Sequence, residues 1–176
     1  MKNLKIMIRL AIASYLLLNL FFYLTTWMHL EFQLAFFTMR MSLPGLSFEQ
    51  IGALSNSALA LAALLNFTGL AISFWAMKQL WAMLSTLTPE TSFSRDNIEL
   101  WKRFSAGILA ATAFSILELP LRGLLFSLFK FNAGIKIEVG VSTEQLMLLL
   151  FCLLSYLVAQ LFQQAHRLEQ ENKEFI

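Results

Sequence analysis

The sequence predicts an all-α integral membrane protein that folds as an antiparallel four-helix bundle with short, strand-like external loops. Of the 176 residues, 58% are hydrophobic and only 14% are charged, whereas soluble domains carry about 25% charged residues. The apolar residues gather in four stretches, at about 6–28, 55–77, 105–129 and 145–165. Each can cross a hydrocarbon core about 30 Å thick, which takes about 20 residues. The connections are short, so residues 1–176 are predicted to form a single four-span membrane domain.

The first span begins like a secretory signal peptide, because Lys2 and Lys5 precede an apolar run. The run is nevertheless long and aromatic at its far end, with Phe21, Tyr23 and Trp27, and it lacks a small-x-small cleavage site there. We therefore expect it to be retained as a signal anchor.

Two external connections carry turn or strand signals. The first, at about 29–56, contains Leu43-Pro44-Gly45, which is a turn signal. In the third, 132–141, apolar residues alternate with others between glycines, which is typical of a short strand. A lone strand would leave its edge open, so we expect this strand to pair with part of the first connection. The alternative is an irregular loop.

The second connection predicts helices that extend beyond the bilayer. Pro89 favours an end to the second helix just before it, because proline lacks an N–H and restricts its neighbour. Ser94 is a good N-cap for the third helix. Residues 78–84 and 98–104 would then form a short cytoplasmic stalk, and the fourth helix is expected to continue outward as well.

The distribution of Lys and Arg predicts that both termini face the cytoplasm. Nine basic residues lie at the termini and around the second connection, against three in the first and third connections, with Arg122 inside a span left out. Basic loops stay on the cytoplasmic side. The tryptophans agree, since Trp27 lies at the predicted outer boundary and Trp75, Trp81 and Trp101 lie at the inner one.

Each span carries a stripe of small or polar residues at helical spacing, and we expect the four stripes to turn inward. Small residues let membrane helices approach closely, and polar ones hydrogen-bond between helices. In chain order, the stripes are Tyr15, Asn19, Tyr23 and Thr26; Ser55, Ala62, Asn66, Gly69 and Ser73; Gly107, Ala111, Ser115, Glu118 and Arg122; and Cys152, Ser155, Tyr156, Ala159, Gln160 and Gln163.

The mid-span members of these stripes predict a central polar layer, which is a candidate ligand or proton site. Its members are Asn19, Asn66, Glu118, Arg122, Ser155 and Tyr156. A charged carboxylate at the bilayer centre costs about 2.5–3.5 kcal/mol. Arg122, four residues after Glu118, could offset this cost by a salt bridge, or Glu118 could be neutral by protonation. The alternative to a functional site is a polar clamp that fixes helix register.

The sequence predicts neither an enzyme nor a cofactor or metal protein. It shows no phosphate loop, metalloprotease helix or nucleophile elbow. Cys152 is the single cysteine, and His29 and His166 are predicted on opposite sides of the membrane. The net charge of +2 is too small to indicate direct nucleic-acid binding. Whichever function the protein has, the sequence predicts that it contacts the lipid bilayer.

Two cytoplasmic stretches resemble a family of small bacterial four-span membrane proteins, the domain of unknown function 2975 family. The stretch that opens with Phe93-Ser94-Arg95-Asp96-Asn97 is similar to the segment that begins the family's third helix, and the tail that ends at Glu171-Asn172 is similar to its other hallmark. Gln163-Gln164-Ala165 and the last four residues depart from the family pattern. The resemblance implies a bacterial inner (plasma) membrane location, no established activity, and a cytoplasmic helix-turn-helix regulator as partner.

These observations predict a non-enzymatic membrane protein for envelope sensing or regulatory interaction. Its cytoplasmic partner would contact Phe93, Arg95, Asn97, Arg167 and Asn172. The alternative function is a small transporter, or a bundle that binds a lipid or small molecule at a central site around Glu118. Four spans are few for a monomeric transporter, so that alternative would need a homo-oligomer.

Overall fold

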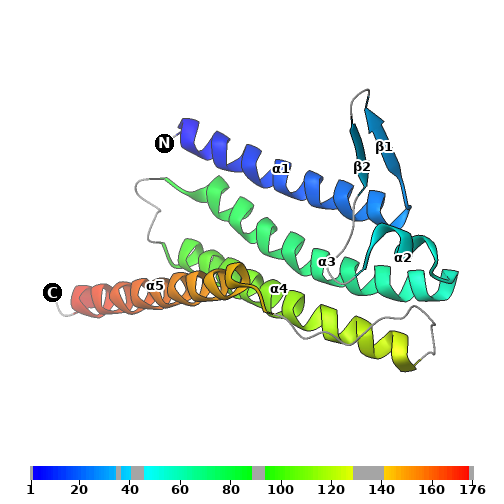
Figure 1. The fold of residues 1–176 in the computed structure, drawn as a ribbon. Helices are drawn as coiled ribbons and strands as arrows, with labels where there is room; N and C mark the ends of the chain where they lie inside the picture. Colours follow the sequence, from blue (N-terminus) through cyan, green and yellow to red (C-terminus); the bar gives the residue numbers. More distant parts are fainter. Residues whose placement is uncertain (1, 35–36, 41–45, 89–93, 129–140, 175–176) are drawn as a thin grey trace. The chain divides into compact units, whose positions relative to one another are not determined.

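The computed structural model describes residues 2–34, 37–40, 46–88, 94–128 and 141–174. Its elements, in chain order, are α1 (Lys2–Trp27), β1 (Glu31–Leu34), β2 (Phe37–Arg40), α2 (Phe48–Gly52), α3 (Asn56–Thr86), α4 (Arg95–Leu128) and α5 (Thr143–Glu174) (Figure 1). In this part of the chain, four helices are long and apolar enough to cross a membrane. Each helix covers its predicted span to within one residue, which confirms a helical fold built on four long apolar helices and indicates a multi-pass membrane protein.

The helices α3 and α4 extend beyond their apolar spans, as the sequence predicts. The helix α3 ends at Thr86, three residues before Pro89, and Pro89 itself lies outside the described residues. The helix α4 begins after Ser94, whose Oγ accepts a hydrogen bond from the Asn97 amide at 3.4 Å. The Ser94 carbonyl also accepts from the Ile98 amide at 3.1 Å. The predicted N-cap is therefore confirmed.

Two capping boxes fix helix starts that the sequence analysis did not identify. At α2, the Gln50 amide donates to Ser47 Oγ at 3.2 Å, while the Ser47 amide donates to Gln50 Oε1 at 2.8 Å. At α5, Ser142 and Gln145 repeat this arrangement at 3.1 and 2.9 Å. Each pair satisfies backbone donors that have no partner inside the helix. The start of α5 is thus two residues earlier than the predicted span.

The first connection contains an antiparallel hairpin of β1 and β2, which the sequence analysis did not predict. Its register pairs Glu31 with Arg40 at the open end and Leu34 with Phe37 at the turn. The strand predicted over 132–141 falls outside the described residues, except for its last position, so its pairing with the first connection stays a prediction.

The chain divides into two compact units. Unit 1 comprises residues 1–13, 72–113 and 142–176, and unit 2 comprises residues 14–71 and 114–141. The helices α1, α3 and α4 contribute residues to both units, α5 belongs to unit 1, and the hairpin with α2 belongs to unit 2. The single four-span domain over 1–176 stays a prediction.

Unit 2 is built on an apolar cluster around the end of α1. Its buried members are Trp27, Leu46, Ile51, Ala58, Ala62 and Phe126. His29 has a positive φ of 52° and stacks its ring on Phe48, with 3.8 Å between the ring centroids. A Cβ at Gly52 would lie 2.8 Å from the His29 ring. Glycine at position 52 therefore lets α2 approach the turn that follows α1.

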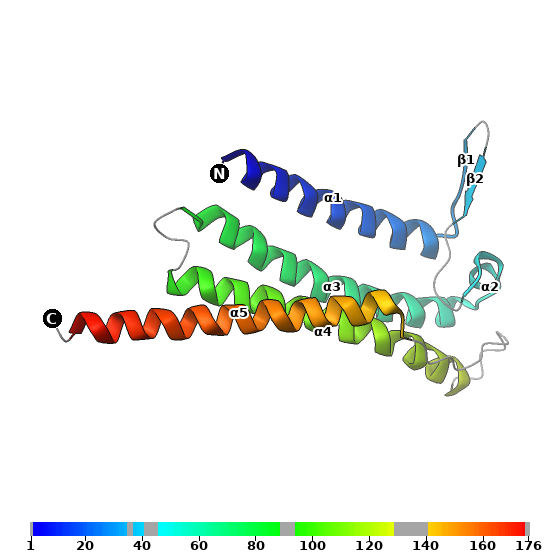
Figure 2. The ribbon, with the colours of Figure 1, turned by 60° about the vertical axis from the view of Figure 1, so that its left-hand side comes forward.

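Unit 1 packs through small residues. A Cβ at Gly107 would lie 2.7 Å from Ala76 Cβ and 2.9 Å from Trp75 Cζ3, so glycine is needed for this close approach of α4 and α3. On α5, Cys152 is 3% exposed and Ala159 is fully buried. Figure 2 and Figure 1 agree that α5 lies alongside the first part of α4. Small residues at helix contacts are typical of membrane proteins.

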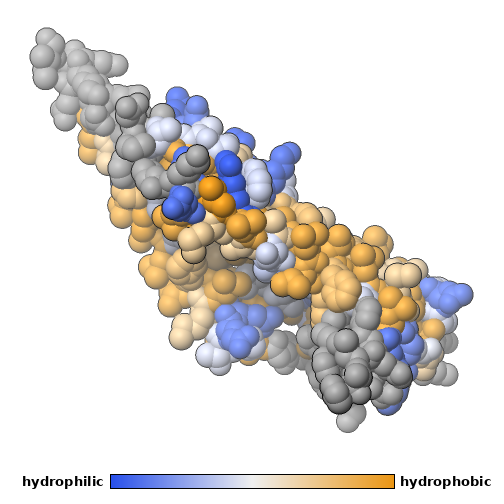
Figure 3. Space-filling view, turned by 90° about the horizontal axis from the view of Figure 1, so that it is seen from above, coloured by the Kyte–Doolittle hydropathy of each residue, from blue (hydrophilic) through white to orange (hydrophobic). Residues whose placement is uncertain are grey.

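The apolar side chains of α5 point away from the protein. Leu146, Leu150, Leu153, Leu157 and Leu161 are all exposed, and hydrophobic side chains cover a broad part of the face drawn in Figure 3. The predicted inward stripe of the fourth span is confirmed by the burial or half-burial of Cys152, Ser155, Tyr156, Ala159, Gln160 and Gln163. Apolar residues outside and small or polar residues inside suit a protein surrounded by lipid.

The inward stripes of the other three spans are wrong at three positions. Tyr15, Ser55 and Ser115 are exposed. Tyr15 and Ser115 lie at the edges of their stripes, where the helical period turns a side chain away from the neighbouring helix. Ser55 precedes α3 and so does not follow that helix's period.

Candidate functional site

The predicted contact between Glu118 and Arg122 is present in unit 2. Arg122 Nη1 lies 2.8 Å from Glu118 Oε1, one turn away on α4. The Arg122 side chain is 3% exposed and that of Glu118 is 17% exposed. Helical spacing brings the two side chains together. The bond is charge-assisted and lies largely out of solvent, where such bonds are stronger than neutral ones.

Tyr23 of α1 belongs to the same unit as this pair and is half-buried. Its ring packs against Phe67 of α3, with 6.5 Å between the ring centroids. The sequence analysis placed Tyr23 on the inward stripe but not in the central polar layer. The unit thus contains the Glu118–Arg122 pair of α4 and a tyrosine of α1 whose ring packs on α3.

Asn66 is another buried polar residue of unit 2. It is 2% exposed, and its Oδ1 accepts a hydrogen bond from Trp27 Nε1 at 3.0 Å. Its Nδ2 has no hydrogen-bond partner in the described part of the chain. An unsatisfied buried donor costs about 1–3 kcal/mol. The position of Trp27 in the sequence indicates only that it lies at the outer boundary of the first span. In the structure Trp27 is 6% exposed, and its indole N–H donates the hydrogen bond to Asn66.

Asn19 makes a local hydrogen bond. Its Nδ2 donates to the Tyr15 carbonyl at 2.8 Å, within α1. Asn19 belongs to unit 2 together with Asn66, Glu118 and Arg122.

The remaining members of the predicted polar layer, Ser155 and Tyr156, belong to unit 1. Ser155 Oγ accepts from Trp101 Nε1 at 2.8 Å and lies 2.9 Å from Ser105 Oγ, so it joins α5 to α4. The Tyr156 hydroxyl accepts from Gln160 Nε2 at 3.2 Å. Within each unit, these contacts join neighbouring helices or neighbouring turns, and a single layer shared by all six residues stays a prediction.

The residues predicted to contact a cytoplasmic partner differ in their surroundings. Arg95 and Arg167 are exposed. Asn97 is 2% exposed, and its Oδ1 accepts a hydrogen bond from Thr86 Oγ1, so it links α4 to α3. Phe93 lies outside the described residues, as does the side chain of Asn172.

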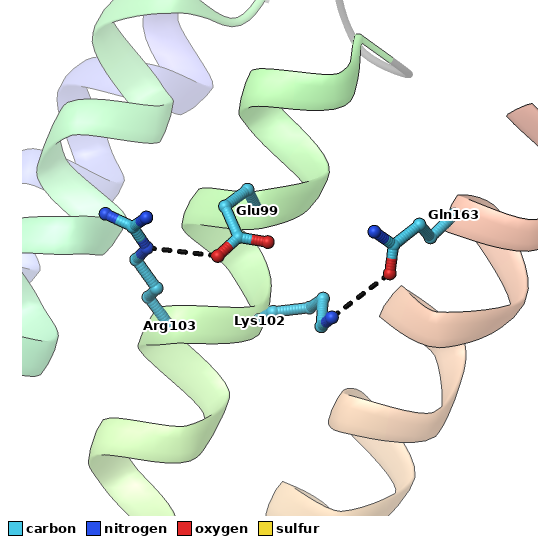
Figure 4. Close-up of polar contacts among 4 residues, drawn as sticks. All are labelled: Glu99, Lys102, Arg103 and Gln163. Carbon is cyan, nitrogen blue, oxygen red and sulfur yellow. Dashed lines mark hydrogen bonds and ion pairs between the residues drawn. The ribbon is translucent and has the colours of Figure 1, made fainter.

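Polar contacts on α4 point in two directions near its start. Arg103 Nε lies 3.1 Å from Glu99 Oε1, and both side chains are largely exposed. Lys102 Nζ donates to Gln163 Oε1 of α5 at 3.0 Å. Figure 4 shows the first pair on one side of α4 and the second between α4 and α5. An exposed ion pair of this kind contributes about 0.3–0.5 kcal/mol and lies within α4, whereas the Lys102–Gln163 bond joins α4 to α5.

In unit 1, two basic residues of α1 contact the last part of α3 or the residue that follows it. The sequence analysis used these basic residues only to predict the orientation in the membrane. The Arg9 guanidinium carbon lies 5.4 Å from the centre of the Trp81 ring. Arg9 Nε is buried and has no hydrogen-bond partner among the described residues. Lys5, one turn earlier on α1, donates to the carbonyl of Leu87 beyond the end of α3.

The described residues contain no group of three or more His, Cys, Asp or Glu side chains that could hold a metal ion. Comparison of the chain with protein-family models, curated proteins and solved structures finds no match. The family resemblance of the two cytoplasmic stretches therefore stays a prediction.

Proposed function

We propose that this chain is a non-enzymatic protein of the bacterial inner membrane that acts in envelope sensing or regulation through a cytoplasmic protein partner. In this proposal α1, α3, α4 and α5 cross the bilayer in antiparallel order, with both termini in the cytoplasm. The charge distribution supports the orientation, because basic segments stay on the cytoplasmic side. The family resemblance adds a helix-turn-helix regulator as the partner to test first.

The proposal rests on one observation, which is that the ends of α4 and α5 in unit 1 expose polar side chains. On α4, Arg95 and Asp96 precede the apolar span and are exposed. On α5, Arg167 and Leu168 follow it and are exposed, Leu168 by 60%. An exposed leucine beside an arginine, outside the apolar span, is suited to a protein contact, since interfaces combine apolar and Arg side chains.

The contacts inside the spans support a role without catalysis. Ser155 of α5 forms hydrogen bonds with both Trp101 and Ser105 of α4. Trp27 and Asn66 do the same between α1 and α3. Such hydrogen bonds hold membrane helices together. They use the polar groups as structural links, and none is a nucleophile beside a base.

The experiment is site-specific crosslinking in native membranes, with a photoreactive side chain at Arg95 or Arg167. We expect the same cytoplasmic protein to be captured from both positions. With the probe at Arg167, Arg95→Ala should reduce the yield of the crosslinked partner. With the probe at Arg95, Arg167→Ala should do the same. Glu144→Ala is the control, because it removes an exposed charge at the opposite end of α5. Unchanged capture in the arginine variants would reject this surface as the docking site.

A second candidate function is a transporter or a lipid- or small-molecule-binding bundle with its site around Glu118. The observation that favours it is Asn66 Nδ2, a buried donor with no partner in the described part of the chain. An oxygen atom of a ligand could accept from this group. Native mass spectrometry of the detergent-purified protein should then find a bound molecule that Asn66→Leu removes and that Thr68→Leu, at an exposed position of α3, retains. A protein without any bound molecule would reject this function.

A further inference from the structure

We propose that Lys5, Arg9 and Lys78, together with the Trp81 ring, bind the headgroup of an anionic phospholipid in the cytoplasmic leaflet. The inference rests on the membrane placement and orientation of the proposed function, and it adds a ligand that the proposed protein contact does not require. All four residues belong to unit 1.

The geometry places two cations on one face of α1, toward the end of α3. Lys5 and Arg9 are one turn apart and share a helix face. Arg9 lies over the Trp81 ring, at 5.4 Å from the guanidinium carbon to the ring centre. Lys78 is three residues before Trp81 on α3 and is exposed, so it lies beside Trp81 on that helix.

The cations lack a carboxylate. Neither α1 nor α3 contains an acidic residue. Among the residues that the structure describes, Lys5, Arg9 and Lys78 form no ion pair. Arg9 Nε, which is buried, also has no hydrogen-bond acceptor there. A guanidinium carries five donors in a rigid fork, and phosphate oxygens match this fork bidentately.

Lys5 is held in place and still has donors to offer. One N–H of its ammonium group donates to the Leu87 carbonyl. An ammonium group has three donors, so two remain for an anion. The hydrogen bond to Leu87 ties α1 to the end of α3, which fixes the position of Lys5 relative to Arg9 and Trp81.

The depth of Arg9 suits a lipid phosphate. Arg9 is three residues inside the first apolar span, and a helix rises about 1.5 Å per residue, so its Cα lies about 4.5 Å below the span's start. A long basic side chain can extend from that depth to the headgroup level. Trp75 and Trp81 are 48% and 43% exposed, and exposed indoles favour the same level.

Apolar surface beside the cations favours a lipid over a free anion. Leu4 and Leu10, which flank Lys5 and Arg9 along α1, are 61% and 63% exposed. These side chains can contact acyl chains while the cations bind the phosphate. Basic sites between membrane helices on the cytoplasmic side are known to bind anionic headgroups.

The test uses quenching of tryptophan fluorescence by brominated lipids in reconstituted vesicles. Brominated phosphatidylglycerol and brominated phosphatidylcholine are compared at equal mole fraction in a phosphatidylcholine background. The difference in quenching between the wild type and Trp81→Phe gives the part of the quenching that is due to Trp81. We expect phosphatidylglycerol to quench Trp81 preferentially.

Substitutions then identify the residues that carry the preference. Arg9→Gln should reduce the relative affinity for phosphatidylglycerol about fivefold, equivalent to about 1 kcal/mol for one charge near the surface. Lys5→Gln combined with Arg9→Gln should reduce it about thirtyfold. Arg9→Lys keeps the charge but loses the bidentate fork, so its loss of preference should be smaller than that of Arg9→Gln but not zero. The control is Arg103→Gln, which removes one exposed charge elsewhere in unit 1 and should leave the preference unchanged.

Each other outcome overturns the proposal. A wild-type protein that enters vesicles but shows no preference, or an Arg9→Gln variant that keeps it, rejects the lipid site and leaves the membrane placement intact. Equal loss in Arg103→Gln would show that only overall charge matters. Competition by millimolar inorganic phosphate would assign the site to a free anion. Failure of the wild type to enter vesicles, checked by flotation, would reject the membrane placement and the lipid site together.

Discussion

Replacing Glu118 by leucine should destabilise unit 2, because the buried Arg122 guanidinium would lose its carboxylate. The two side chains meet at 2.8 Å, and the Arg122 side chain is 3% exposed. Its charge would therefore remain in an environment with little water. The helix itself tolerates the change, since leucine is a good helix former.

Two independent scales give a similar magnitude for this loss. Removing one partner of a buried ion pair costs about 3–5 kcal/mol, and an arginine at the centre of a membrane helix costs about 2.5–3.5 kcal/mol on the insertion scale. We expect about 3 kcal/mol, which lowers the folding equilibrium constant by about a hundredfold. Glu118→Gln should lose less, because the amide oxygen still accepts a hydrogen bond from Arg122.

The assay is equilibrium unfolding in mixed micelles of dodecyl maltoside and sodium dodecyl sulfate, followed by tryptophan fluorescence. The double variant Glu118→Leu with Arg122→Leu should recover the wild-type stability or exceed it, because replacing a whole buried pair by apolar residues is often neutral or stabilising. A loss below about 1 kcal/mol in Glu118→Leu would show that the pair is not desolvated. A double variant as unstable as the single one would show that Arg122 is not the cause.

Two further substitutions test the helix contacts in the same assay. Gly107→Leu should destabilise unit 1 by about 1–3 kcal/mol through overpacking, because a Cβ there already approaches Ala76 to 2.7 Å, whereas Ala110→Leu on the exposed side of α4 should have little effect. Trp27→Phe should cost about 1–3 kcal/mol, because the buried Asn66 loses its indole donor, and an unchanged midpoint would show that this hydrogen bond is not needed.

The sequence predicts the long helices well because each is a long apolar run of about the length that a membrane span needs. Their extensions could also be predicted, since Pro89 and Ser94 act locally on the chain. The hairpin and α2 are short, so they carry no long periodic pattern. The signal for α2 was nevertheless present, as Ser47 and Gln50 have the spacing of a capping box.

The spacing of residues along the sequence predicts polar contacts within one helix but not those between helices. Glu118 and Arg122 lie on one helix, so their contact follows from the helical period alone. Trp27 and Asn66 are 39 residues apart and lie on different helices. Their contact depends on how two helices are rotated and shifted against each other, which periodicity within one helix does not fix.

The single cysteine of the chain gives every stability measurement an internal reporter. Cys152 is 3% exposed in the folded protein and lies within the apolar span of α5, so a maleimide dissolved in water can alkylate it only after unit 1 opens to water. The rate of labelling in the mixed micelles therefore reports the opening of α5 without a fluorophore or an introduced thiol.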